Sequence, residues 1–460
     1  MKPAFAMTLA QIQQAVSCTA HQHIAPAVII DSVVTDSRKV VPGCLFVAII
    51  GEKFDAHDFL ADVVKQGAAA VVVERLPAGL SVPALVVTNT RVALGEIAHA
   101  WRAQFTLPVI GVTGSNGKTT VKEMIAAILT AAFGVESALA TQGNLNNDIG
   151  VPQTLFRFNA EHRAAVIELG MNHPGEIAQL TAIAAPTVGL VNNAQREHQE
   201  FMQSVEAVAR ENGAVIVGLP EDGVAVFPAD DTYSNLWRSY SGARKTMTFG
   251  LAHEQSDADV SATFVETDTG SQLTVFIDVD ILHIQLHAFG VHNVLNALAA
   301  IACCHAIGCS HDAIIQGLQG FQPVSGRLQK KLAHNAAVII DDTYNANPDS
   351  VRAAIHVLAQ AAGEKILVLG DMGEVGADGP AYHVEIAAYA KQHGIPVLFT
   401  LGQLARHSCD AFGSGAMHFE QLEPLLEKLD ACVTSTSTIL VKGSRFMKME
   451  RVVTHLMHKV

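Results

Sequence analysis

Residues 108–133, PVIGVTGSNGKTTVKEMIAAILTAAF, constrain the fold more than any other part of the chain. Residues 107–112 are apolar and predict a strand, and residues 114–120 predict a loop. The following residues place their apolar side chains on one helical face: Val121, Met124, Ile125, Ile128 and Leu129. A strand that leads through a glycine-rich loop into a helix is the setting of a phosphate-binding loop. We therefore expect a sheet covered by helices, with a phosphate site at its edge.

The residue types in this loop suit a nucleoside triphosphate. Glycines at 114 and 117 let backbone N–H groups turn toward phosphate oxygens, and the helix N-terminus adds partial positive charge. A lysine can then reach the β- and γ-phosphates, and a threonine hydroxyl can ligate Mg²⁺. The spacing departs from GxxxxGK[ST], because Val112 stands in place of the first glycine, so a chance glycine-rich turn is the alternative. We expect a nucleoside triphosphate and Mg²⁺ to bind at Gly114, Asn116, Gly117, Lys118, Thr119 and Thr120.

Short apolar runs alternate with helical patterns along most of the chain, which predicts the α/β class. Residues 260–289 differ, because Leu273, Val275, Ile277 and Val279 alternate with polar residues that include Asp278 and Asp280. This pattern predicts an antiparallel meander. The buried strands that we expect elsewhere are 69–73, 85–87, 109–112, 165–169, 188–191, 338–340, 366–369, 397–400 and 439–441.

Length and composition bound the domain number and the partners. A chain of 460 residues, 49% of them hydrophobic, predicts about three domains. We place one boundary before a helical pattern that ends at Trp101, and the other near FQPVSGR, which gives domains 1–88, 89–320 and 321–460. A net charge of −14 argues against nucleic-acid binding. Seven cysteines without a CxxC pair predict neither a disulfide framework nor a zinc site.

The sequence also predicts where the protein works. The first residues lack a continuous apolar stretch, and no later apolar run approaches the ~18 residues of a transmembrane helix. We therefore expect a cytoplasmic protein without a transmembrane segment, and a monomer.

Two residues are candidate metal ligands. Glu168 ends the apolar run AAVIEL, and the carboxyl edge of a parallel sheet is where ligands bind. A helix-capping or surface carboxylate is the alternative. His198 in NNAQREHQEF is the second candidate, although a lone histidine in a loop often makes only hydrogen bonds.

Several motifs, read in order, resemble one family. They are GVTGSNGKTT, TQGNLNNDIGVP, VIELGMNHPGEI, NNAQREHQEF, GVHNVLNALAA, SGRLQ, DDTYNANPDS, LGDMGEVG and KGSRFMKME. The chain is similar over about residues 30–450 to the Mur ligases, and DDTYNANPDS and KGSR resemble the branch that adds a D-alanyl-D-alanine dipeptide.

The resemblance implies a three-domain architecture and a reaction. An N-terminal domain would hold the UDP end of UDP-N-acetylmuramoyl-tripeptide, a central P-loop domain would hold ATP, and a C-terminal Rossmann-like domain would hold D-alanyl-D-alanine. The carboxylate of the tripeptide would be activated as an acyl phosphate and joined to the amine.

The resemblance also assigns roles to residues. It places Lys118, Glu168 and His198 in catalysis, and Thr119, Glu168 and His198 at the metal. ATP contacts would come from Asn293, Asn296, Arg327 and Asp342, and substrate contacts from Asp36, Ser37, Arg38, Asn144, Asn147, Tyr344, Asn345 and Asn347. Each assignment has an alternative: the two asparagines at 293 and 296 could be cap and surface residues, the arginine at 327 a surface residue, and residues 344–347 turn residues before a proline.

The chain departs from the family at one position. Many ligases of this superfamily carry a carbamylated lysine after the metal histidine, but this chain has Asn212 there. Either Glu211 supplies the missing charge, or a second magnesium has fewer protein ligands. Two other functions stay open: a related ligase that adds a different amine, and a nucleotide-switch protein, although no NKxD motif of a GTPase occurs.

Overall fold

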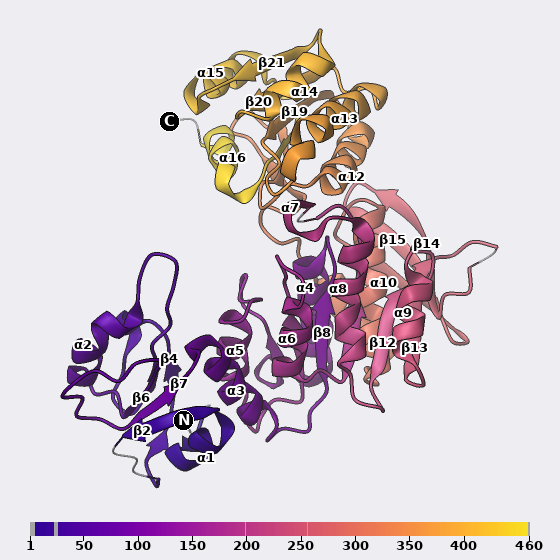
Figure 1. Ribbon diagram of the computed structural model, residues 1–460. Coiled ribbons are helices and arrows are strands. Elements are labelled where there is room, and N and C mark those ends of the chain that lie inside the picture. The colour runs from indigo at the N-terminus through magenta and orange to yellow at the C-terminus, as the bar shows by residue number, and fades with distance from the viewer. Residues whose placement is uncertain (1–4, 23–25, 198, 255, 459–460) are drawn as a thin grey trace.

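The computed structural model describes residues 5–22, 26–197, 199–254 and 256–458. Three sheets follow one another along the chain, and Figure 1 shows them as three successive bodies from indigo to yellow. Counted over the described residues, these sheets have five, nine and six strands. The α/β class that the sequence predicts is therefore confirmed, whereas the domain limits 1–88, 89–320 and 321–460 stay predictions.

The N-terminal sheet has the strand order β2-β7-β6-β5-β4. Strands β4 to β7 are parallel, and β2 is antiparallel to β7. The short strands β1 (Met7–Thr8) and β3 (Ile29–Ile30) pair separately. The other elements are β2 (Cys18–Gln22), β4 (Val33–Val34), β5 (Leu45–Val47), β6 (Ala70–Val73), β7 (Ala84–Val87), α1 (Leu9–Ala15), α2 (Leu60–Lys65), η1 (Ser37–Lys39) and η2 (Ala56–Phe59).

A long helix, α3 (Thr90–Arg102), follows this sheet. It begins at Thr90, because the Asn89 side chain accepts hydrogen bonds from the backbone N–H groups of Arg91 and Val92. Its buried face, which includes Leu94, Ile97 and Trp101, packs in the same apolar core as part of the central sheet.

The central sheet has the order β16-β15-β14-β13-β12-β11-β8-β10-β9. It is parallel from β9 to β14 and ends in an antiparallel meander, β14-β15-β16. The meander is confirmed, but Val279 does not share a face with Leu273 and Val275. It lies in the turn after β15 with 95% of its surface exposed. The strands are β8 (Val109–Thr113), β9 (Ala138–Ala140), β10 (Ala164–Glu168), β11 (Val188–Val191), β12 (Val224–Pro228), β13 (Lys245–Leu251), β14 (Val260–Thr267), β15 (Gly270–Ile277) and β16 (Asp280–Leu286).

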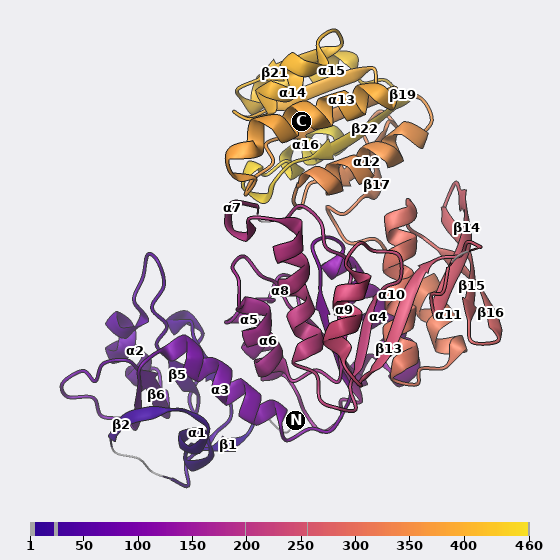
Figure 2. The same cartoon turned by 45° about the vertical axis from the view of Figure 1, so that its right-hand side comes forward.

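Successive side chains of β8 point to opposite faces of the central sheet, and each face has its own apolar core. Val109 points to the core that contains α6 and α8, while Ile110 and Val112 point to the core that contains α4, α10 and α11. Helices therefore cover both faces, as Figure 2 shows for α8 on one side and α10 on the other. The helices are α4 (Lys118–Phe133), α5 (Gly150–Leu155), α6 (Glu176–Ala184), α7 (Gln199–Met202), α8 (Val205–Val217), α9 (Ser234–Ser241), α10 (Val291–Ala306), α11 (His311–Gly320) and η3 (Val135–Ser137).

The C-terminal sheet has the order β17-β18-β22-β19-β20-β21, with β17 antiparallel to an otherwise parallel sheet. The last strand in sequence, β22, lies between β18 and β19. Helices α12 and α13 cover one face, and α15 and α16 cover the other. The elements are β17 (Gln329–Leu332), β18 (Val338–Asp342), β19 (Glu364–Gly370), β20 (Val397–Leu401), β21 (Ala416–Phe419), β22 (Ser437–Lys442), α12 (Pro348–Gln360), α13 (Gly379–Gln392), α14 (Ala405–Phe412), α15 (Leu422–Cys432), α16 (Glu450–Met457), η4 (Gly376–Asp378) and η5 (Arg445–Met447).

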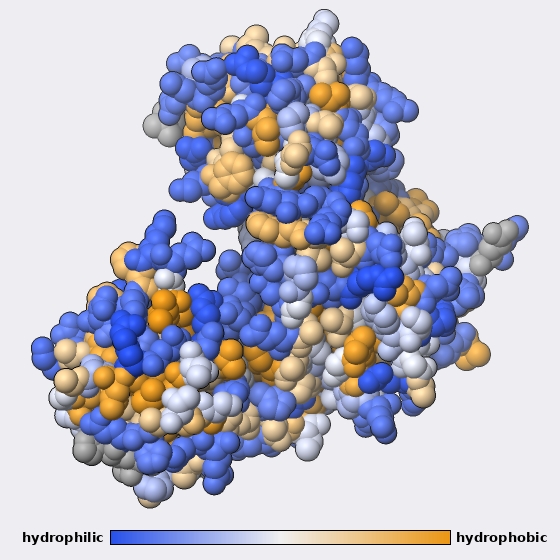
Figure 3. Space-filling model, in the orientation of Figure 1, coloured by the Kyte–Doolittle hydropathy of each residue, from blue (hydrophilic) through white to orange (hydrophobic). Residues whose placement is uncertain are grey.

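The three bodies leave one side of the molecule open. Figure 3 shows a hollow between the N-terminal and C-terminal bodies, with mainly hydrophilic residues of the central body at its floor. Among the described residues, no helix is both long and apolar enough to cross a membrane.

Candidate active site

The phosphate loop lies where β8 passes into α4. Gly114 has a φ of +132° and Gly117 a φ of +81°, a backbone region that favours glycine. A Cβ atom at residue 117 would lie 2.4 Å from Asn296 Oδ1, so a side chain cannot fit there. The helix begins at Lys118, inside the stretch 114–120 that the sequence predicts as loop, because Gly117 in the left-handed conformation serves as its N-cap.

The Lys118 ammonium group has three acceptors in this structure. It donates to the carbonyl oxygens of Gly114 and Ser115, and to Glu197 Oε1 at 2.9 Å. Both charged side chains are largely buried, with exposed fractions of 14% for Lys118 and 12% for Glu197. The sequence reasoning did not identify Glu197, although it lies next to His198 in the motif NNAQREHQEF.

A buried carboxylate faces the threonine of the loop. Glu168, at the end of β10, accepts a hydrogen bond on Oε1 from Thr119 Oγ1 at 3.2 Å and from Asn146 Nδ2 at 2.8 Å. Its other oxygen, Oε2, is buried and has no hydrogen-bond partner among the described residues. This geometry is inconsistent with a surface carboxylate, and a buried oxygen with free lone pairs suits a hard cation such as Mg²⁺.

Asparagines surround the other side of the loop. Asn296 accepts from Asn192 Nδ2 at 2.9 Å and donates to Asn293 Oδ1 at 3.2 Å. Asn293 and Asn296 are both buried, so the interpretation of these residues as surface residues is wrong. Asn192, which also donates to the Asn116 carbonyl oxygen, is a loop contact that the sequence reasoning missed.

The C-terminal domain reaches the phosphate loop through Arg327. Its Nη2 donates to Thr119 Oγ1 at 2.9 Å, and its guanidinium lies over the Tyr344 ring, 4.1 Å from the centroid. Arg327 is therefore not a free surface residue. Nearby, Asp342 is buried and pairs with the Lys442 ammonium, which also donates to the Asn345 carbonyl oxygen at 2.9 Å.

Asn347 joins the same contact. It is the N-cap of α12, since its side chain accepts from the Ser350 N–H, which agrees with the alternative interpretation of this segment as turn residues before Pro348. Its Nδ2 also donates to Asn116 Oδ1 at 2.9 Å, across the two domains. One residue therefore serves both as a helix cap and as a contact to the loop.

An arginine makes a second contact between the domains. Arg196 follows β11 and forms ion pairs with Asp349 of α12 at 2.6 Å and with Glu385 of α13 at 2.7 Å. Its hydrogen bond lowers the pKa of Glu385, with a smaller contribution from Arg352. Arg196 also lies 5.3 Å from the centre of the Tyr382 ring. These contacts attach the segment after β11 firmly to the C-terminal domain.

The substrate residues expected outside the loop lie in two places. Asp36, Ser37 and Arg38 lie at η1 in the N-terminal domain, where a hydrogen bond from Arg38 lowers the pKa of Asp36 to about 2. Asn144 and Asn147 lie in the loop before α5; the Asn147 side chain accepts from the Gly150 N–H. The direct contact to Glu168 comes instead from the residue between them, Asn146.

Asn212, at the position of the carbamylated lysine of related ligases, and its neighbour Glu211 both make hydrogen bonds within the fold. Asn212 is buried, and its Oδ1 accepts the Gly114 N–H at 3.0 Å, so this amide supports the loop. Glu211 accepts from the N–H groups of Gly175 and Ile177, both at 2.8 Å, and thereby caps α6. Glu211 is thus engaged in a helix cap rather than in the phosphate loop. His198, the expected metal ligand, lies outside the described residues.

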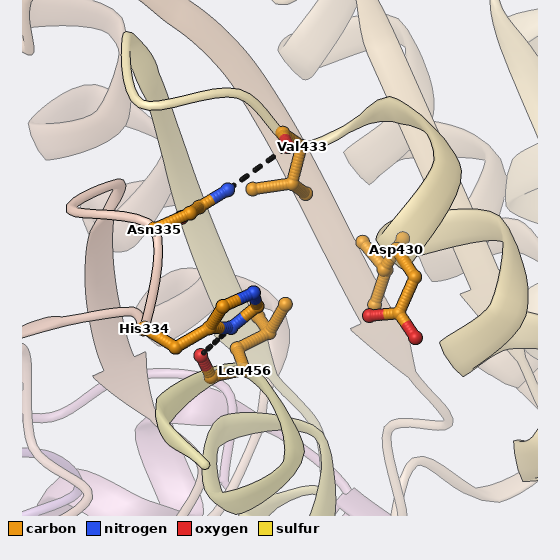
Figure 4. Close-up of a pocket in the computed structure, with 6 residues that line it drawn as sticks. His334, Asn335, Asp430, Val433 and Leu456 are labelled. Carbon is orange, nitrogen blue, oxygen red and sulfur yellow. Dashed lines mark hydrogen bonds between the residues drawn. The ribbon is translucent and has the colours of Figure 1, made fainter. Parts of the chain in front are cut away.

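The described part of the C-terminal domain contains a smaller and a larger cavity. Figure 4 shows the smaller one, of about 40 Å³, where Asn335 donates to the Val433 carbonyl oxygen and His334 contacts that of Leu456. It has room for a few water molecules only. The larger, of about 310 Å³, is lined by residues that include Tyr344 and Arg445. The described part of the chain holds no group of three or more His, Cys, Asp or Glu side chains placed to bind a metal ion.

Comparison with known proteins identifies the family. Three family models match successive segments: the Mur ligase family catalytic domain over residues 29–102, the Mur ligase middle domain over 112–304, and the Mur ligase glutamate ligase domain over 326–445. The UDP-N-acetylmuramoyl-tripeptide–D-alanyl-D-alanine ligase of Escherichia coli (strain K12) is 43% identical over 428 residues, 92% of this chain and 93% of that protein. The chain belongs to the Mur ligase family.

Solved structures of Mur ligases agree with this membership. A crystal structure of MurF from Acinetobacter baumannii superposes with a TM-score of 0.93 at 34% identity, covering 99% of this chain and 100% of that one. MurF from Thermotoga maritima in complex with ADP gives a TM-score of 0.84 at 26% identity, covering 92% and 96%. This Mur ligase therefore has the three-domain α/β architecture and is an ATP-dependent ligase, so the nucleotide-switch alternative is wrong.

Proposed function

We propose that this Mur ligase joins D-alanyl-D-alanine to UDP-N-acetylmuramoyl-tripeptide, with conversion of ATP to ADP and phosphate, in peptidoglycan synthesis. The observation that carries the proposal is the match to the E. coli ligase of that name, at 43% identity across nine-tenths of both chains. The loop of Gly114 to Thr119 supports it, because its backbone and Lys118 suit the phosphates of ATP.

The reaction has two steps. A carboxylate oxygen of the tripeptide attacks the γ-phosphorus of ATP, the bond to the bridging β-γ oxygen breaks, and ADP leaves. The amine of the dipeptide then attacks the carbonyl carbon of the acyl phosphate and loses a proton, and the C–O bond to phosphate breaks as the amide forms. Phosphoryl transfer of this kind depends on positioning and on positive charge near the transferring group.

The residues of the site divide this work. Lys118 neutralises charge on the β- and γ-phosphates, and Arg327 approaches from the C-terminal domain. Thr119 and Glu168 would hold Mg²⁺, with His198 as the third ligand, and the free Oε2 of Glu168 fits this role. Magnesium would supply further positive charge to the phosphate oxygens. Asn293 and Asn296 contact adenine, and Asp342 reaches ATP from the C-terminal domain.

The remaining residues surround the two substrates. Asp36, Ser37 and Arg38 bind the uridine diphosphate end in an N-terminal domain of residues 1–88. Asn144 and Asn147, in the loop before α5, contact the substrate from the central domain of residues 89–320. Tyr344, Asn345 and Asn347 contact the dipeptide in the domain of residues 321–460, and the cavity of about 310 Å³ beside Tyr344 supports this placement. The enzyme works as a monomer in the cytoplasm, where ATP is available.

The test is a phosphate-release assay in which each substrate is omitted in turn. ATP, UDP-N-acetylmuramoyl-tripeptide and D-alanyl-D-alanine together should give phosphate, ADP and a pentapeptide product detectable by mass spectrometry. Single amino acids such as D-glutamate, diaminopimelate or lysine should not replace the dipeptide. Faster phosphate release with one of these amines, and ligation of that amine, would assign the chain to another branch of the family.

A further inference from the structure

The pairing of Lys118 with Glu197 is unexpected at a phosphate site. The ammonium group of a lysine has three hydrogens to donate. In this structure, Gly114, Ser115 and Glu197 accept all three of them. A phosphate oxygen can therefore reach Lys118 only if one acceptor leaves. Two acceptors are backbone carbonyl oxygens of the loop itself, so the Glu197 side chain is the exchangeable one.

The charge of Glu197 also opposes phosphate binding at Lys118. A carboxylate 2.9 Å from the lysine cancels much of the positive charge that the loop offers to a phosphate. It also repels the phosphate, and this repulsion is weakly screened because both side chains are largely buried.

The position of Glu197 depends on the C-terminal domain. Arg196, the preceding residue, pairs with Asp349 and Glu385 of that domain, and its backbone N–H also donates to Asp349 at 2.9 Å. On its other side, Gln195 accepts from Asn116 Nδ2 of the phosphate loop at 2.6 Å. Residues 195–197 therefore link the loop to α12 and α13, and we name them the bridging segment.

We propose that Glu197 is the resting counter-ion of the phosphate-loop lysine, that a nucleoside triphosphate must displace it, and that Arg196 holds it in place. Glu197 is a positioning residue in this scheme. This inference rests on the proposed function only in that Lys118 binds ATP phosphates. Its consequence is that the apparent affinity for ATP includes the cost of breaking the pair, and that movement of the C-terminal domain changes this cost.

The first test measures binding of a non-hydrolysable ATP analogue to the full chain at saturating Mg²⁺, by calorimetry. Glu197→Gln should bind the analogue about tenfold more tightly, because one partly buried ion pair of about 1.4 kcal/mol no longer competes. Glu200→Gln is the matched control, since it removes the same charge from an exposed side chain three residues away and should leave the affinity unchanged.

The second test uses a double-mutant cycle with Arg196→Gln. Arg196→Gln alone loosens the bridging segment, and it should tighten analogue binding by a few fold relative to the parent. The same change in the Glu197→Gln background should have no effect, because the competitor is already absent. An equal effect in both backgrounds would show that Arg196 acts on the nucleotide independently of Glu197.

Two results would overturn the assignment of Glu197. Weaker binding in Glu197→Gln with a raised Mg²⁺ requirement would make this carboxylate part of the metal site. Unchanged binding would show that it does not compete with phosphate. A parent protein that binds no ATP analogue would instead overturn the proposed function, so the two failures are distinguishable.

Discussion

Replacing Glu168 by glutamine should raise stability while it removes activity. The Glu168 carboxylate is 2% exposed, and its Oε2 has no hydrogen-bond partner among the described residues. A buried polar atom without a partner costs about 1–3 kcal/mol, and more when it carries charge. Glutamine keeps Oε1 as the acceptor for Thr119 and Asn146, and its Nε2 stays a buried polar atom without a protein partner. The change therefore removes only the extra cost of burying a charge, and the metal-free protein should gain about 1 kcal/mol or somewhat more.

Thermal unfolding in EDTA measures this gain directly. A gain of that size should raise the melting temperature of the central domain by about 2–6 °C. Adding Mg²⁺ and ADP should then raise the melting temperature of the parent much more than that of the variant, because the variant lacks a charged ligand. Ligation by the variant should fall by at least about 100-fold, since positive charge at the phosphates is lost.

Glu211→Gln is the matched control for this experiment. Both Glu211 oxygens accept backbone N–H groups at the start of α6, so removing the charge should lower the melting temperature in EDTA rather than raise it. If Glu168→Gln is less stable than the parent in EDTA, its carboxylate is already satisfied by the protein, and the argument that it is kept for a cation is refuted.

Three further predictions follow from the site and its surroundings. Lys118→Ala should reduce ligation at least about 100-fold while the circular dichroism spectrum is retained, because the side chain contacts the loop and Glu197 rather than an apolar core; activity within tenfold of the parent would contradict the phosphate-loop assignment. Burial lowers the pKa of the His292 imidazole from 6.5 to about 4. As the pH falls, the unfolded chain therefore takes up a proton before the folded chain does. The stability that depends on neutral His292 is complete above pH 6.5 and is lost progressively between pH 6.5 and about pH 4. Between pH 7 and pH 5 the free energy of unfolding should drop by about 2 kcal/mol more in the parent than in His292→Gln, measured in urea, with exposed His283→Gln as the control. Ligation should not depend on bicarbonate, and Asn212→Lys should not raise it, because the Asn212 side chain already accepts the Gly114 N–H; a rise in the parent's rate on adding bicarbonate would show that a lysine elsewhere is carbamylated.

The sequence predicted most accurately those elements that depend on a short local pattern of residues. Residues 109–112 and 188–191 are continuous apolar runs, and both became central parallel strands, because only a strand covered on both faces buries every side chain. The phosphate loop was equally clear, since its glycines, lysine and threonine lie within one turn of each other. Alternation predicted the meander, but at Val279 the pattern continued into a turn, where period-two alternation has no structural meaning.

The contacts that complete the site could not be predicted in this way. Arg327 meets Thr119, and Asn347 meets Asn116, across separations of 208 and 231 residues. No local periodicity encodes such a pairing. Asn146 was missed for a different reason: three asparagines lie within four residues of GNLNND, and the loop backbone decides which of them faces Glu168.

The position of β22 has a consequence for how the protein is made. This strand is almost the last element of the chain, yet it lies in the middle of the C-terminal sheet and carries Lys442 to Asp342. The sheet cannot close until residues 437–442 have left the ribosome, whereas the first two sheets can form during synthesis. A nascent chain stalled or cut shortly before residue 437 would therefore expose the unpaired edges of β18 and β19, two strands that are otherwise buried, and such edges promote aggregation. Quality control of this ligase should thus act most strongly on products that end shortly before residue 437.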